Sequence, residues 1–136
     1  MRGIAVLSFV MSLVLMSCGA RAQTHAALTG ITWVAEDIGG DGVIDNLQST
    51  FTVDEGGRVS GMAGCNRFNG MAKLEGTTIL VGPLAASRKM CPPAIMDQER
   101  KFLEALTKAK SFEIEDAFLW LLGDDGVPLV RLVKQG

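Results

Sequence analysis

Three cysteines and one histidine are the side chains of this 136-residue sequence best suited to covalent, metal or acid–base chemistry. Cys65 and Cys91 enclose about 27 residues, and they lack the C-x-x-C spacing that is typical of redox-active pairs. His25 lies too near a mobile end of the mature chain to anchor a buried site, so Ser60 and Ser87 have no imidazole to activate them. We therefore expect no catalytic residue, no metal site and no cofactor.

Residues 1–22 have the composition of an export signal, with a basic start, an apolar run too short for a stable membrane span, and small residues at the end. Two processing sites compete within this segment. Residues 15–18 (LMSC) resemble a bacterial lipobox, which makes Cys18 a candidate lipid anchor. Cleavage after Ala22, at an A-x-A site, would instead release a soluble protein. We favour the lipobox and keep the second site as the alternative.

The export signal predicts a location in the cell envelope. A lipidated Cys18 followed by Gly19 predicts an outer-membrane lipoprotein facing the periplasm, because the Asp that commonly retains such proteins at the inner membrane is absent. Cleavage after Ala22 predicts a soluble periplasmic or secreted protein. An oxidising compartment favours a disulfide between Cys65 and Cys91, which is worth about 3.5 kcal/mol by the loop-entropy formula. A free thiol pair and a redox-active or metal-binding pair are the alternatives.

Length and charge narrow the class of protein further. Removing the signal leaves roughly 114 residues, the size of one domain. We expect a linker over residues 23–30 and the domain over residues 31–134. The chain has 13 Lys and Arg against 15 Asp and Glu, a formal net charge of −2. Since Arg2 and Arg21 lie in the signal, the mature chain is more acidic still, which argues against nucleic-acid binding.

The elements that must position these residues follow from short apolar runs separated by Gly-rich and Asp-Gly turns. This spacing is typical of an antiparallel all-β barrel or sandwich. One segment differs, because residues 94–109 are rich in helix formers and place Ile95, Phe102, Leu103 and Leu106 on one face. We expect this α-helix to pack against the sheet. Strands are predicted over residues 31–35, 49–53, 58–62, 69–74, 77–81, 111–115, 118–122 and 128–133.

An acidic, Gly-rich loop covers residues 36–45. Asp37, Asp41 and Asp45 recur at four-residue spacing, but they do not match the ligand positions of a calcium-binding EF-hand loop. Asp-Gly pairs between strands are more often turns. We therefore predict a structural turn here.

Three spaced motifs carry a resemblance to a known family. They are residues 61–70 (GMAGCNRFNG), residues 86–92 (ASRKMCP), and the DQE sequence at 97–99 with Phe102 and Leu103. Together they resemble the META domain, also called the HslJ-like family, from about Trp33 to Leu132. The resemblance implies a small antiparallel β-barrel, a lipocalin-like meander, with one helix. It also implies a bacterial envelope protein, often a lipoprotein, associated with heat shock and novobiocin resistance and without an established catalytic activity.

Polar residues of these motifs form the candidate site. Asn66, Arg67, Asn69 and Arg88 lie close in sequence to the two cysteines, so a disulfide would bring their backbones together. One interpretation is a hydrogen-bonded network, with Asp97 as a further acceptor, that fixes the junction between strand and helix. The other is a positively charged spot that binds an anionic group, such as a lipid head group or a partner carboxylate.

The resulting functional hypothesis is a monomeric, non-enzymatic envelope module that binds or stabilises another envelope protein or surface in stress and antibiotic tolerance. Two alternatives remain at this point. One is an inhibitor of an envelope enzyme. The other is a carrier that holds a small apolar ligand inside the barrel. The residues proposed to line that cavity, or otherwise to form the core, are Trp33, Phe51, Phe68, Phe118, Leu119 and Trp120.

Overall fold

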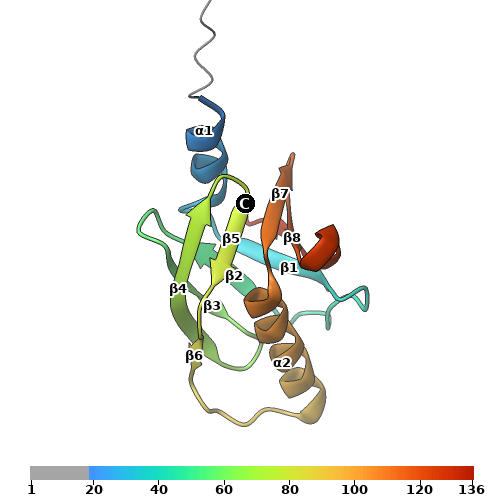
Figure 1. The fold of residues 1–136 in the computed structure, drawn as a ribbon. Coiled ribbons are helices and arrows are strands. Elements are labelled where there is room, and N and C mark those ends of the chain that lie inside the picture. The colour runs from blue at the N-terminus through green and yellow to red at the C-terminus, as the bar shows by residue number, and fades with distance from the viewer. Residues whose placement is uncertain (1–18) are drawn as a thin grey trace, which may run out of the picture.

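The computed structural model describes residues 19–136, with side chains from Thr24 onward, so the expected anchor Cys18 lies outside the described residues. Figure 1 shows a curved sheet with one helix at an end and a longer helix beside it. The elements in chain order are α1 (Gly19–Leu28), β1 (Trp33–Ile38), β2 (Thr50–Val53), β3 (Arg58–Met62), β4 (Arg67–Glu75), β5 (Thr78–Val81), β6 (Ala85–Ala86), α2 (Pro93–Lys108), β7 (Ser111–Glu115), β8 (Phe118–Leu122), a short 3-10 turn (Asp124–Gly126) and β9 (Pro128–Lys134).

The strands form where apolar and polar residues alternate. In β2, Phe51 and Val53 are buried, while Thr50 and Thr52, which alternate with them, are only partly buried. In β8, Leu119 and Leu121 are fully buried and Phe118 is exposed. This two-residue period places one face of each strand toward a common core.

The described residues form a nine-stranded antiparallel sheet that closes into a barrel-like ring. The strand order is β3-β2-β1-β9-β8-β7-β5-β4-β6, and an additional pairing between β3 and β4 joins the two sides. Apart from the short β6 on β4, each strand pairs with its neighbours in the chain, and β9 returns to β1. The expected barrel-like antiparallel meander with one main helix is therefore confirmed.

The ring is weakest between β5 and β7. One pair of residues, Thr78 and Ser111, is in register across this seam, whereas five pairs join β7 to β8. The chain between β5 and β7 contains β6, the disulfide loop and α2. The two strands therefore meet only near their ends.

Helix α2 packs its inner face into the core. Phe102 and Leu106 are fully buried, as their spacing predicts, while Ile95 and Leu103 are only partly buried. Gln98 and Glu99 are also buried, which the apolar stripe did not indicate. The helix contacts β1, β5 and β9 and so covers the region where β5 and β7 separate.

Residues 23–30, expected as a linker, contain the second half of helix α1. Leu28 is fully buried in the core, and the indole Nε1 of Trp33 donates a hydrogen bond to its carbonyl at 3.1 Å. Figure 1 places α1 at the end of the ring opposite the loop between β6 and α2. The described residues thus form a closed sheet with one core, and α1 packs on that core through Leu28.

Neither described helix has the length and apolar character needed to cross a membrane.

Candidate functional site

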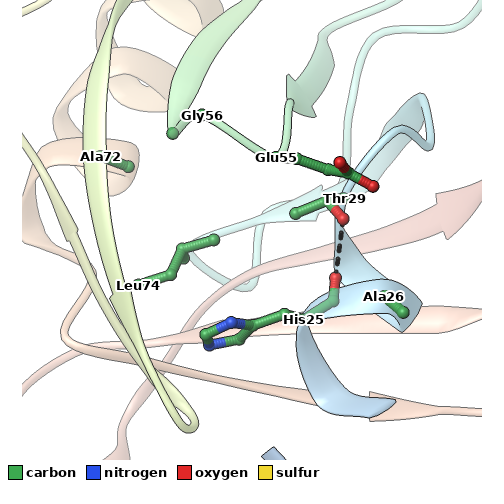
Figure 2. Close-up of a pocket in the computed structure, with 8 residues that line it drawn as sticks. His25, Ala26, Thr29, Glu55, Gly56, Ala72 and Leu74 are labelled. Atoms are coloured by element: carbon green, nitrogen blue, oxygen red, sulfur yellow. Dashed lines mark hydrogen bonds between the residues drawn. The ribbon is translucent and has the colours of Figure 1, made fainter. Parts of the chain in front are cut away.

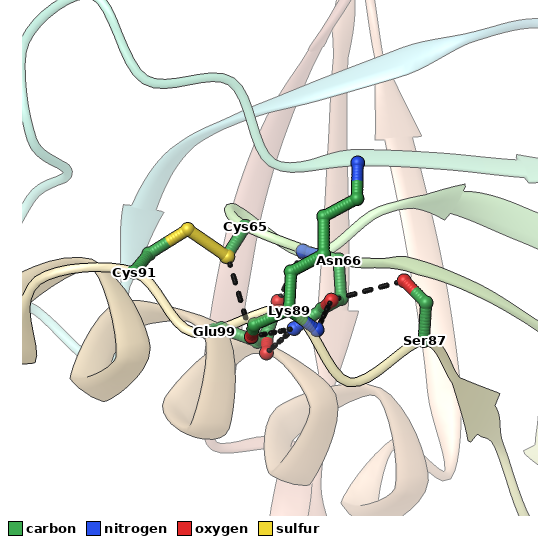
Figure 3. The surroundings of a disulfide bond; sticks show 6 residues. All are labelled: Cys65, Asn66, Ser87, Lys89, Cys91 and Glu99. Atoms are coloured by element: carbon green, nitrogen blue, oxygen red, sulfur yellow. Dashed lines mark hydrogen bonds between the residues drawn. A yellow bond between two sulfur atoms is a disulfide. The ribbon is translucent and has the colours of Figure 1, made fainter.

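A disulfide between Cys65 and Cys91 joins the turn before β4 to the start of α2, as Figure 3 shows. The two Cα atoms are 6.1 Å apart. Cys65 is buried at the end of the β3–β4 turn, and Cys91 precedes the two prolines that begin the helix. Proline suits this position because its missing N–H is one that the first helical turn leaves unbonded in any case. The disulfide interpretation of the cysteine pair is therefore the one that the structure supports.

Asn66 is the centre of a buried polar network beside the disulfide. Its Nδ2 donates to Glu99 Oε2 at 2.8 Å and to the Lys89 carbonyl at 3.1 Å. Its Oδ1 accepts from the Ser87 hydroxyl at 2.9 Å and from the Lys89 backbone N–H at 2.7 Å. The Asn66 backbone N–H donates to Glu99 Oε1 at 2.6 Å. One side chain thus fixes three segments: the β3–β4 turn, the loop after β6, and α2.

Glu99 is the member of this network that sequence reasoning missed. An acidic side chain early in a helix suits the helix dipole without being buried, yet Glu99 is only 6% exposed. The available signal was its place in the DQE motif, four residues before the apolar Leu103 and three before Phe102. A helix with 3.6 residues per turn puts positions 99, 102 and 106 on one face.

Gln98, the neighbouring motif residue, forms a second polar link. Its Oε1 accepts from the Ile44 backbone N–H at 2.7 Å, and its Nε2 donates to the Ser49 hydroxyl at 3.2 Å. The Ser49 hydroxyl in turn donates to the Ala63 carbonyl at 3.0 Å. The DQE motif therefore ties α2 to the β1–β2 loop as well as to the β3–β4 turn.

The structure separates the four expected site residues. Asn66 is buried in the network, whereas Arg67, Asn69 and Arg88 are exposed. Among the described residues, neither arginine side chain has a hydrogen bond or an ion pair. Asp97 is not their acceptor, because it pairs with Arg100 at 2.8 Å on the surface of α2. The network interpretation thus holds for Asn66 with Glu99 as its partner, and the arginines lie outside it.

The glycines of the first motif allow close packing of the backbone. A Cβ on Gly61 would overlap the Thr50 carbonyl of the neighbouring strand. A Cβ on Gly70 would lie 2.7 Å from Leu84 Cδ2 and 2.9 Å from the Pro83 carbonyl. The Gly-rich sequence is therefore a packing requirement of β3 and β4.

The residues proposed to line a ligand cavity divide between two faces of the sheet. Trp33, Phe51, Phe68 and Leu119 are buried in the core, where Phe68 meets Phe102 edge to face at 6.0 Å between centroids. Phe118 and Trp120 lie on the outer face of the sheet. The Arg131 guanidinium carbon lies 5.6 Å from the Trp120 ring centre and 5.9 Å from that of Phe118. These residues do not line one common cavity.

The acidic loop is held as a turn. The Asp37 carboxylate accepts from the Gly40 N–H at 2.9 Å and from the Gly42 N–H at 2.8 Å. Asp41 lies 3.7 Å from Lys101 on α2. Asp37 is therefore occupied by its own loop, as expected for a turn-forming aspartate.

A groove of about 470 Å³ lies between α1, the β2–β3 turn and β4 (Figure 2). His25 lines it from α1 and Glu55 from the turn. The imidazole belongs to helix α1 and its Nε2 is buried without a hydrogen-bond partner in the described structure, so His25 is part of a helix and not of the expected linker. Thr29 at the end of α1 donates to the His25 carbonyl at 2.9 Å.

All three sequence motifs therefore meet at one junction of strand, loop and helix. The family model of the META domain matches residues 26–136. The chain belongs to the META domain family. Among curated proteins, none matches this META-domain chain.

Three solved structures are similar to this META-domain protein. The NMR structure of a protein from Burkholderia xenovorans has a TM-score of 0.65 at 19% identity and covers 96% of this chain and 99% of its own. A second NMR structure has a TM-score of 0.63 at 24% identity, covering 79% and 92%. The crystal structure of a DUF4847 family protein from Bacteroides vulgatus has a TM-score of 0.62 at 14% identity, covering 83% and 99%. At these identities the likeness shows the fold alone.

Proposed function

We propose that this META-domain protein is a non-enzymatic binding module of the bacterial cell envelope, anchored through Cys18, that stabilises envelope components under heat or antibiotic stress. The observation that carries the proposal is the Cys65–Cys91 disulfide at the junction of the family motifs. Structural disulfides persist in oxidising compartments and are rare in the cytosol. The motif residues around it, Asn66, Gln98 and Glu99, are bonded to backbone and to one another, which leaves them no free group for catalysis.

The anchor supports a role that depends on contact with other molecules. Several acyl chains on Cys18 would hold the domain stably at a bilayer, since each buried CH₂ adds about 0.8 kcal/mol. Within the described residues, the domain carries exposed side chains that form no ion pair or hydrogen bond, among them Arg67 and Arg88. Contact with an envelope protein or surface is the function that this arrangement favours.

Two measurements on native cells test the proposal. Intact-mass analysis of the envelope fraction, with and without reduction before alkylation, should find an acylated N-terminal Cys18 and two cysteines that alkylate only after reduction. A deletion strain should show lower survival under heat and novobiocin, restored by the intact gene and not by a Cys18→Ala copy. A cytoplasmic chain with both thiols free, or a deletion strain that survives both challenges as well as its parent, would contradict the proposal.

A further inference from the structure

The seam between β5 and β7 leaves part of one strand edge open. Two hydrogen bonds cross this seam beside the Thr78–Ser111 pair. Ile79 N–H donates to the Lys110 carbonyl at 3.1 Å, and Phe112 N–H donates to the Thr77 carbonyl at 2.9 Å. β5 begins at Thr78, whereas β7 continues to Glu115. The last part of β7 therefore extends beyond its neighbour.

Ile114 occupies the open part of this edge. Alternate residues of an antiparallel strand direct their backbone N–H and C=O groups to the same edge. The N–H and C=O of Ile114 therefore face the β5 side of β7, as those of Phe112 do. The β7–β8 hairpin is consistent with this alternation, because Glu115, the residue after Ile114, pairs with Phe118 on the opposite edge of β7. In the part of the chain that the structure describes, the N–H and C=O of Ile114 have no bonding partner across the seam.

A groove of about 690 Å³ runs along this edge. It is lined by Thr24 and Ala27 of α1, by Thr77, and by residues 112–115 of β7. Figure 1 shows β7 rising beyond the start of β5 at the end of the ring where α1 lies. The edge is thus accessible, and the groove gives it a second wall.

We propose that the open edge of β7 binds an extended segment of a partner polypeptide by strand addition, with Lys or Arg at alternate positions of that segment. Strand addition supplies affinity through main-chain hydrogen bonds and specificity through alternate side chains. The proposal rests on the binding role proposed above and names the chemistry of the partner. Ile114 N–H and C=O pair with the backbone of the added strand.

The charges of β7 select a basic partner. Glu113 and Glu115 are exposed on the outer face, and within the described structure neither forms an ion pair. A strand added to β7 places every second side chain next to these carboxylates. A second copy of β7 would set glutamate against glutamate, which is unfavourable, so the same charges protect the edge against self-association.

The inner face of the added strand meets apolar groups. Ile114 is half-buried and packs against the core, and Ala27 of α1 lines the opposite wall. Side chains such as Val or Thr fit this side because they are small and favour extended backbone. The segment therefore alternates a basic residue with a β-branched one.

The test uses residues 19–136, which contain the whole ring, both helices and the disulfide, together with the acetylated and amidated peptide Val-Lys-Val-Lys-Val-Lys. Amide hydrogen exchange is followed by NMR. We expect the Ile114 amide to exchange rapidly in the free protein and at least about tenfold more slowly at saturating peptide. Two peptides of the same sequence carry N-methyl groups on alternate amides, in opposite phases. In one of the two peptides the methyl groups replace the N–H donors that face β7, and this peptide should not protect the Ile114 amide.

Charge is tested with a matched pair of variants. Glu113→Lys with Glu115→Lys should weaken peptide binding about tenfold or more, since attraction becomes repulsion. Asp45→Lys, an exposed acid in the β1–β2 loop, should change binding less than about twofold.

Several outcomes would overturn the proposal. They are an unprotected Ile114 amide at saturating peptide, equal binding of both N-methylated peptides, equal loss in the Asp45 variant, or protection of Ile114 that rises with protein concentration alone. The last result would identify a second copy as the occupant. None of these measurements depends on cellular location. A failure of strand addition therefore leaves the envelope proposal to be judged by fractionation, and a cytoplasmic location would not by itself disprove strand addition.

Discussion

Asn66 and Asn69 are three residues apart in one motif and have opposite roles. Asn66 is 2% exposed, and its side chain bonds the loop after β6 and the Glu99 carboxylate. Asn69 lies in β4 with its side chain exposed to solvent. A buried amide that satisfies a buried carboxylate is expensive to remove, whereas an exposed amide is not.

Replacing Asn66 by Ala should therefore destabilise the protein by about 3 kcal/mol, because Glu99 loses a side-chain donor and the Lys89 amide loses its acceptor. Urea unfolding followed by circular dichroism measures the change. Asn69→Ala is the control and should shift stability by less than about 0.5 kcal/mol. Equal effects of the two variants would show that the network does not hold the junction.

At the scale of elements, the disulfide links the turn before β4 to the residues that immediately precede α2. Replacing both Cys65 and Cys91 by Ala should cost about 3.5 kcal/mol, because the unfolded chain regains the entropy of the closed loop. The native protein treated with reductant should show a similar loss in urea unfolding. If the double variant is as stable as the oxidised protein, the disulfide has no structural role.

The surface of α2 carries a pH-dependent ion pair. Hydrogen bonds from Arg100, and then from Lys101, lower the pKa of Asp97 below its usual value. A lowered folded-state pKa means that the charged carboxylate contributes stability above the unfolded-state pKa. That contribution is lost as the pH falls through the folded-state value.

Asp97→Asn should therefore lower the stability measured near neutral pH slightly and reduce the dependence of stability on acidification. The effect is small and weakened by salt because the pair is exposed. Urea midpoints of the parent and the variant, compared between neutral pH and pH about 2, test it. The same difference between the two pH values in the variant and in the parent would contradict the prediction.

Sequence patterns predicted some of the helices and strands accurately and missed others. Strands with alternating apolar residues, such as β7 and β8, begin and end at the predicted residues, because each buries one face of a repeating pattern. β6 was not predicted, since two exposed alanines carry no alternation. Residues 23–30 were expected to be a linker, because this short segment carries no long apolar stripe from which a helix could be predicted. Among the α1 side chains that the structure describes, Leu28 is the one that is fully buried.

The candidate site was predicted only in part for a related reason. The cysteine pair could be predicted from count and compartment, and Asn66 from its motif. Glu99 was missed, because its motif and helical spacing place it on the inner face of α2 but do not identify the partner 33 residues away that its burial depends on. Arg67 and Arg88 were grouped with the network by their nearness in sequence to the cysteines, but adjacent residues of an extended chain point to opposite sides.

At the scale of the whole molecule, stability is distributed unevenly around the ring. β9 pairs with β1 on one edge and β8 on the other, so its amides are covered on both sides. The β5–β7 seam has one residue pair in register. Local opening should therefore begin at this seam.

Native-state hydrogen exchange should find the seam amides of Ile79 and Phe112 exchanging about tenfold or more faster than those of Val130 and Leu132 in β9. All four residues are buried, so a difference in exchange rate does not reflect a difference in side-chain exposure. Equal protection would mean that the ring opens only by global unfolding.

Because β9 pairs with β1, the strands follow one another around a closed ring. The chain ends could therefore be moved to another turn without changing which strands are neighbours. Gln135 N–H donates to the Thr32 carbonyl at 2.9 Å, which sets the end of the chain beside the start of β1. Helix α1 adds about 15 Å back to Gly19, a span that a flexible linker of about eight residues covers. A circularly permuted chain, joined from Gly136 to Gly19 and opened between Gly76 and the exposed Thr77, should therefore keep every strand pairing and still form the disulfide.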